Sequence, residues 1–225
     1  MNELLLKIDL HVHTCYSTDA GTTLEEVVTY SKKHGLDGVA ITDHDTLKGA
    51  LKLTNRKELL VIPGIEITTL GGHVLALNVR EEVLPRMPLS ETIRRIHELG
   101  GIAVAAHPKT LYKGIGQQIA SSLGFDAIEV INSSAFPFFF STYLSRKVAL
   151  RLGLPQVAGS DAHYPPEIGF AYTIIDAAPE VGEIVHAIKR GETLPCGRPI
   201  PWKLRLKGEC LKLKRNINKH SAEWL

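Results

Sequence analysis

Short apolar segments alternate along the chain with longer segments whose apolar residues recur every three or four positions. The short segments predict buried β-strands, and the longer ones predict amphipathic helices. Strands are expected at residues 4–12, 37–42, 59–67, 73–79, 102–106, 127–131, 155–159 and 171–175. Helices are expected at residues 24–34, 47–53, 90–99, 115–123, 138–152 and 179–190.

This alternation predicts the fold class. A strand followed by a helix, repeated about seven times along the chain, indicates a mostly parallel sheet with helices outside it. A closed barrel and an open, doubly wound sheet both fit the pattern. The chain of 225 residues is long enough for one α/β domain built on a single core.

The C-terminal part has a different composition. After residue 190, three prolines interrupt regular structure and a basic segment follows. Residues 201–225 carry a net charge of +5, whereas the whole chain carries +2, so the remaining residues are net acidic. We therefore expect a main domain over residues 1–190 and an appendage over residues 191–225. The basic tail is able to follow a nucleic-acid backbone, but its few aromatic residues favour a solvated amphipathic end, and a nucleic-acid partner is not expected.

The composition favours a cytoplasmic protein without membrane association. Its 44% hydrophobic and 22% charged residues are ordinary for a globular protein. No apolar run approaches the ~20 residues of a membrane span, and the run at residues 4–6 is short for a signal peptide. Cys15, Cys196 and Cys210 are odd in number and widely spaced, which predicts no disulfide framework.

The residues that follow the strands point to function. In parallel α/β barrels, functional groups gather at the C-terminal ends of the strands, and at least five apolar segments here carry His, Asp or Glu there. Residues i and i+2 of a strand point the same way, so His11 and His13 project together, as Asp161 and His163 do if the strand continues. The polar residues at these ends are His11, His13, Asp43, His44, Glu66, His107, Asp161 and His163.

Such a set predicts a metal site. Burying these groups without partners would cost several kcal/mol each, and divalent cations would supply the partners. Mixed imidazole and carboxylate ligands suit Zn, Mn or Fe. Because cysteine is nearly absent from the set, a structural zinc site closed by thiolates is disfavoured.

The order of the motifs resembles the PHP family, named for polymerase and histidinol phosphatase. The resemblance covers residues 7–190. It is carried by His11-x-His13, Asp19, Asp43-His44, Gly64-x-Glu66, His107-Pro108 and Ser160-Asp161-x-His163.

The resemblance implies a distorted (β/α)7 TIM-like barrel that binds two or three divalent ions of Mn, Zn or Fe. The ligands that it implies are His11, His13, Asp19, His44, Glu66, His73, His107, Asp161 and His163. It places His11, His13, Glu66 and His163 around one ion, Glu66, His73 and His107 around a second, and Asp19, His44 and Asp161 around a third.

The resemblance also implies a hydrolase acting on phosphoric ester bonds. A metal-bridging hydroxide is the expected nucleophile, and the expected substrate is a small phosphomonoester or phosphodiester, such as a nucleotide, short oligonucleotide or sugar phosphate. Lys109 and Asn132 are candidates for substrate binding. Asp9 and Asp43 are expected either to orient the ligand imidazoles or to cap turns. The sequence assigns no proton donor to the leaving group and no oligomeric state.

Besides a polymerase-associated module, which would require a partner because the sequence contains no polymerase domain, two other functions stay open. Histidinol phosphatase is one, although the chain is short for that subgroup. The other is a non-catalytic RNA-binding scaffold resembling the archaeal RNase P barrel subunit. The basic tail favours the scaffold, and the full set of ligand-type residues opposes it.

Overall fold

The computed structural model describes residues 5–108 and 124–222, with side chains as far as residue 212. Its strands form one sheet in the order β7-β6-β5-β4-β3-β2-β1-β8-β9. The strands are β1 (Leu5–Val12), β2 (Gly38–Ile41), β3 (Leu60–Thr69), β4 (Gly72–Leu77), β5 (Ile102–Ala105), β6 (Ala127–Asn132), β7 (Gln156–Gly159), β8 (Ala171–Asp176) and β9 (Thr193–Gly197). The helices are α1 (Leu24–Lys33), α2 (Lys48–Leu53), α3 (Leu89–Glu98), α4 (Phe138–Leu152), α5 (Val181–Arg190) and α6 (Trp202–Ala222).

The sheet is less parallel than the sequence predicts. β1, β2 and β3 pair in parallel, as do β5, β6 and β7. β4 is antiparallel to both of its neighbours, and β8 and β9 are also antiparallel. The turn between β3 and β4 contains two residues, and so short a connection requires antiparallel strands. The result is a mixed α/β fold with a nearly closed sheet, the distorted TIM-like barrel expected above.

A hydroxyl group joins β7, at one end of this sheet, to β8, the strand next to the other end. The backbone N–H of Ala158 in β7 donates to Thr173 Oγ1 in β8 at 2.8 Å, and the hydroxyl donates back to the Ala158 carbonyl at 3.0 Å. Past the end of β7, Asp161 N donates to His11 O at 2.8 Å, and His13 N donates to Ala162 O at 3.0 Å. We call this contact of β7 and its following residues with β1 and β8 the seam.

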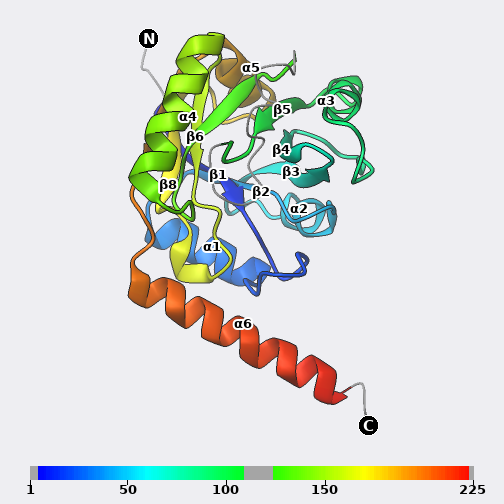
Figure 1. Cartoon of the computed structure of the whole chain (residues 1–225), viewed down its shortest axis with the longest axis vertical. Helices are drawn as coiled ribbons and strands as arrows, with labels where there is room; N and C mark the ends of the chain where they lie inside the picture. Colours follow the sequence, from blue (N-terminus) through cyan, green and yellow to red (C-terminus); the bar gives the residue numbers. More distant parts are fainter. Residues whose placement is uncertain (1–4, 109–123, 223–225) are drawn as a thin grey trace.

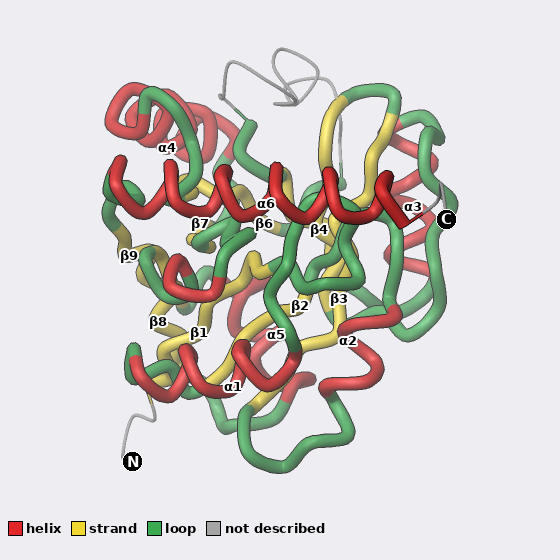
Figure 2. The backbone as a smooth tube through the Cα atoms, turned by 90° about the horizontal axis from the view of Figure 1, so that it is seen from below, coloured by secondary structure: helices red, strands yellow, loops and turns green. Residues whose placement is uncertain are grey.

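The apolar side chains form two cores. One lies inside the barrel, where Leu6, Ile8 and Leu10 of β1 meet apolar residues of the other strands and Ile184 and Ile188 of α5. Figure 2 shows the strands around this interior, with α6 crossing in front of them. The other core packs α1, α2, α3 and α4 against the outside of the sheet (Figure 1). With α5 at one end of the barrel, the opposite end is left for the site.

The C-terminal segment that the sequence predicts to be an appendage contains regular structure. β9 pairs with β8 at the edge of the sheet, where its Pro195 is tolerated. α6 follows as a helix of 21 residues, drawn in orange and red in Figure 1.

The helix expected at residues 115–123 lies outside the described residues. Within the described ranges, no helix combines the length and the hydrophobicity that crossing a membrane requires.

We expect Thr173→Val to lower the free energy of unfolding by about 1–3 kcal/mol, because Thr173 is buried and both polar groups of Ala158 lose their partner. Urea denaturation measures the change. Thr173→Ser keeps the hydroxyl and is the matched control. A valine variant as stable as the wild type would show that the seam does not depend on this hydroxyl.

Candidate metal centre

The open end of the barrel holds all nine residues that the sequence predicts as ligands. Seven of them border a cavity of about 440 Å³: Asp19, His44, Glu66, His73, His107, Asp161 and His163. The other two, His11 and His13 at the end of β1, are fully buried. They contact the same carboxylates, as the distances below show, so the nine side chains form one site.

Glu66 is the common neighbour of the imidazoles. It projects from β3 and is 1% exposed. Its Oε2 lies 3.2 Å from Nε2 of His11 and 3.1 Å from Nε2 of His13. Its Oε1 lies 2.6 Å from Nδ1 of His73 and 3.0 Å from Nε2 of His107. Each carboxylate oxygen therefore lies among a different pair of histidines, an arrangement able to bridge two cations.

His11, His13, Glu66 and Asp161 form the most buried group able to hold an ion. The Nε2 atoms of His11 and His13 face each other at 3.1 Å. Asp161 Oδ1 lies 3.4 Å and 3.2 Å from these two nitrogens. Two imidazole lone pairs that point at one position repel each other unless a proton or a cation lies between them. The converging nitrogen and oxygen atoms therefore fit a divalent ion.

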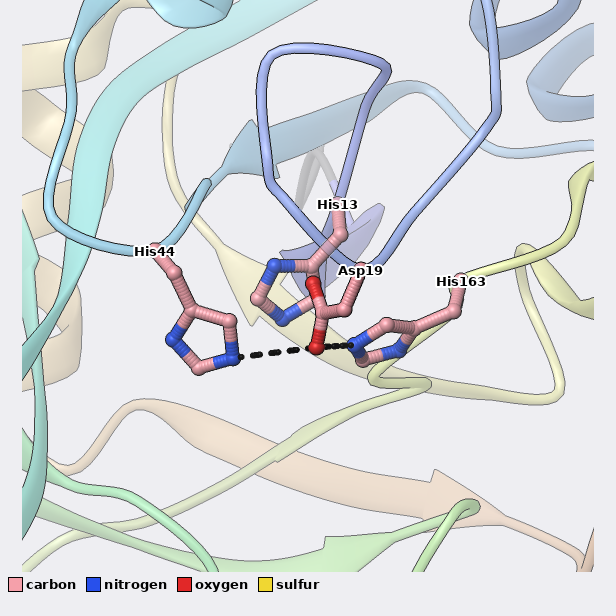
Figure 3. Close-up of side chains that lie close together, drawn as sticks. All are labelled: His13, Asp19, His44 and His163. Atoms are coloured by element: carbon pink, nitrogen blue, oxygen red, sulfur yellow. Dashed lines mark hydrogen bonds and ion pairs between the residues drawn. The ribbon is translucent and has the colours of Figure 1, made fainter. Parts of the chain in front are cut away.

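A second group consists of His13, Asp19, His44 and His163 (Figure 3). Asp19 Oδ2 lies 3.0 Å from Nε2 of His163 and 3.5 Å from Nε2 of His44. The turn after β1 supplies Asp19, and the turn after β2 supplies His44. A third group joins His44, Glu66 and His73. Three groups that share members suit a cluster of ions.

The grouping differs from the one that the resemblance implies. Asp161 lies with His11 and His13, whereas His163 lies with Asp19 and His44. The reason is the backbone of Asp161, which has a φ of 55°. β7 already ends at Gly159, and the left-handed Asp161 breaks the alternation of side chains beyond it, so Asp161 and His163 point into different groups.

Two of the nine candidate ligand residues have unusual backbones. His107 has a φ of 28° and Asp161 a φ of 55°, both in the region that non-glycine residues rarely occupy. Such conformations cost about 1–3 kcal/mol each and cluster at functional sites. His107 N donates to Glu129 Oε2 at 2.8 Å, and Asp161 N donates to His11 O. These hydrogen bonds hold the two residues in place.

Glu129 orients the imidazole of His11. It is buried on β6, and its Oε1 accepts a hydrogen bond from Nδ1 of His11 at 2.9 Å. This leaves Nε2 of His11 to face the centre of the site, as in metal-binding histidines whose second nitrogen donates to a carboxylate. From the sequence, Glu129 is expected near a strand end, in a position to contact substrate or to support the ligand-type residues, and its hydrogen bond with His11 is the supporting contact. The signal was a single carboxylate inside an otherwise uncharged strand.

Asp9 and Asp43 cap backbone turns. Asp9 is fully buried and accepts from the N–H groups of Ser160 at 2.8 Å and Gly169 at 2.8 Å. Asp43 accepts from both the backbone N–H and the hydroxyl of Thr14. Of the two roles expected for them, the described contacts show capping.

Charge balance shifts the pKa values of the site. Burial alone would lower the pKa of His13, but hydrogen bonds with Asp161 and Glu66 raise it to about 9. Burial alone would raise the pKa of Glu66, yet the charge of His11 and hydrogen bonds from the imidazoles lower it well below its usual range. Burial lowers the pKa of His44 to about 4. Protons on imidazoles thus balance the carboxylates, and cations would replace those protons.

The two residues predicted to bind substrate have different outcomes. Lys109 lies outside the described residues. Asn132 borders the cavity, and its amide nitrogen donates to Glu129 Oε2 at 3.0 Å and to Asp161 Oδ2 at 3.2 Å. These contacts make Asn132 a positioning residue for both carboxylates, and its contact with substrate stays a prediction.

Solved structures share this fold. The chain superposes on a two-domain protein from Bacteroides vulgatus, described as containing a predicted PHP-like metal-dependent phosphoesterase, with a TM-score of 0.74 and 18% identity. The match covers 86% of this chain and 65% of that chain, so this chain spans less than two thirds of the two-domain protein.

The relatives in sequence agree with the structural match. An uncharacterised protein from Methanocaldococcus jannaschii is 34% identical over 142 residues, which cover 57% of this chain and 82% of the relative. A probable phosphatase from Caldicellulosiruptor bescii is 25% identical and covers 74% of this chain and 83% of its own length. The model of the PHP domain matches residues 9–114, and that of the PHP-associated region matches residues 142–193. The chain therefore belongs to the PHP family.

Proposed function

We propose that this PHP-family hydrolase cleaves a phosphomonoester or phosphodiester of a small molecule, with two or three divalent cations at the nine-residue site. The observation that carries the proposal is the convergence of His11, His13 and the two carboxylates of Glu66 and Asp161 on one buried position. When bound, divalent cations lower the pKa of a coordinated water and offset the charge of phosphate oxygens.

The chain's own residues prepare the site for such a reaction. Glu129 fixes the tautomer of His11 by accepting the proton of Nδ1. Asn132 and the seam keep Asp161 opposite His11 and His13. The buried walls exclude bulk water around Glu66, which strengthens every electrostatic contact there. Binding, orientation and exclusion of water are thus built into the barrel end.

The family and the cavity suit small substrates such as nucleotides, short oligonucleotides or sugar phosphates. A cavity of about 440 Å³ is within the range of small-molecule sites. The match to a probable phosphatase along most of both chains supports phosphoester chemistry. The convergence of all nine ligand-type side chains supports an enzyme over an RNA-binding scaffold.

We expect His11→Ala to abolish hydrolysis of p-nitrophenyl phosphate or bis-p-nitrophenyl phosphate, with loss of at least one bound ion. The Nε2 atom of His11 faces three other atoms able to bind a metal ion, from His13, Glu66 and Asp161. Elemental analysis and the two colorimetric assays measure the outcome. His186→Ala, at an exposed position of α5, is the control. Stoichiometric metal without turnover of any phosphoester, in wild type as in variant, would refute the proposed enzyme.

We expect Glu129→Gln to lower metal affinity or kcat/KM about 10- to 100-fold, because an amide cannot accept from His11, His107 and Asn132 together. Metal titration and steady-state kinetics measure the change. Glu192→Gln, which alters an exposed ion pair, is the matched control. Unchanged affinity and kinetics in Glu129→Gln would argue against an orienting role.

We expect the apparent metal affinity to rise with pH up to about pH 9. The pKa of His13 is raised to about 9, so below that pH an ion must displace its proton. For one displaced proton the rise is about tenfold per pH unit. Calorimetry in buffers of different ionisation enthalpy counts the protons released. An affinity independent of pH between about pH 7 and pH 9 would contradict this ligand assignment.

A further inference from the structure

The first half of α6 docks beside the candidate metal centre, on the loop that follows β6. The ring of Trp202 packs edge-on against Phe136, with the ring centroids 5.7 Å apart. Nη2 of Arg205 donates to the carbonyl oxygens of Ser133 at 3.4 Å and Ser134 at 3.0 Å. Figure 2 shows that α6 then crosses the open end of the barrel.

A second contact fixes the helix on the loop that follows β7. Gly208 faces Tyr164, and a Cβ atom at position 208 would lie 3.2 Å from the Cβ of Tyr164. Glycine therefore permits the close approach of helix and loop. Because Tyr164 directly follows the ligand-type residue His163, α6 forms a wall of the site.

Arg205 lies where two cavities meet. The cavity of about 440 Å³ contains the candidate metal centre, and a second cavity of about 540 Å³ extends under α6. Both are bordered by Asp19, Ser134, His163 and Arg205. Among the described residues that border the first cavity, Arg205 is the one lysine or arginine.

The guanidinium has unused hydrogen-bonding capacity. Both of its hydrogen bonds use Nη2, and within residues 5–108 and 124–212 neither Nε nor Nη1 has a hydrogen-bond partner. No carboxylate of that part of the chain forms an ion pair with it. An arginine held by backbone carbonyls, with free N–H groups beside a metal site, is suited to bind a phosphate.

We propose that Arg205 is a substrate-binding residue that reaches from α6 and holds a phosphate oxygen of the ester at the junction of the two cavities, an inference that rests on the proposed function. α6 lies outside residues 9–114 and 142–193, the segments that match the family models. This contact is therefore a feature of this chain's C-terminal helix and not of the matched segments.

The test compares Arg205→Gln with Lys207→Gln, which removes the same charge from an exposed position of α6 that borders neither cavity. Calorimetry measures binding of inorganic phosphate to each protein loaded with Mn²⁺. We expect Arg205→Gln to weaken phosphate binding about tenfold or more and to raise KM, whereas Lys207→Gln changes neither by more than about twofold. Equal phosphate affinity in Arg205→Gln and wild type would overturn the assignment.

A second measurement separates binding from docking. Hydrogen exchange of residues 202–212 reports whether α6 stays in place. Weaker phosphate binding with unchanged exchange, partly restored in Arg205→Lys, supports the proposal. Weaker binding with faster exchange throughout α6, and no restoration in Arg205→Lys, would show that Arg205 acts by docking the helix and would overturn it.

The two proposals fail in different ways. If the wild type hydrolyses phosphoesters and Arg205→Gln binds phosphate normally, the proposed function stands and the role of Arg205 does not. If the wild type binds phosphate through Arg205 but hydrolyses no phosphoester, the proposed function fails and Arg205 stays an anion-binding residue.

Discussion

A carboxylate buried inside a protein has to be compensated, and Glu66 imposes this requirement on the whole open end of the barrel. Burial of an isolated charge is among the most costly events in folding. Here imidazoles from β1, β4 and the end of β5 surround the two oxygens of Glu66. The strands must therefore meet with their polar ends together, and the same arrangement that stabilises the carboxylate creates a site for cations.

Other buried carboxylates hold the residues that surround Glu66 in place. Glu129 links His11 to the backbone of His107 and to Asn132, and Asp9 links the end of β1 to the turn after β7. Burial raises the pKa of Asp9 to about 6, although backbone N–H groups oppose the shift. Each of these side chains connects segments far apart in sequence, so the candidate ligand residues are held by the rigid barrel.

The fold and the membership of the site were largely predictable, because hydrophobic periodicity and the residues at strand ends are local signals. Three features were not. The pairing of β4, β8 and β9 depends on connections that the periodicity does not encode. The assignment of Asp161 and His163 to separate groups depends on one left-handed φ, which no alternation predicts. The position of Arg205 depends on how α6 packs against the barrel. The sequence of α6 does not indicate which surface the helix contacts.

The candidate metal centre lies across the seam, so metal binding there would affect the stability of the barrel. His11 lies in β1 and His13 directly follows it, whereas Asp161 follows β7, so an ion held by all three would join the two sides of the seam. Any ion that binds the folded form alone adds its binding free energy to the stability of that form. Metal binding and the stability of the closed barrel are then thermodynamically coupled. A chelator that removes the ions would destabilise the protein first at the seam.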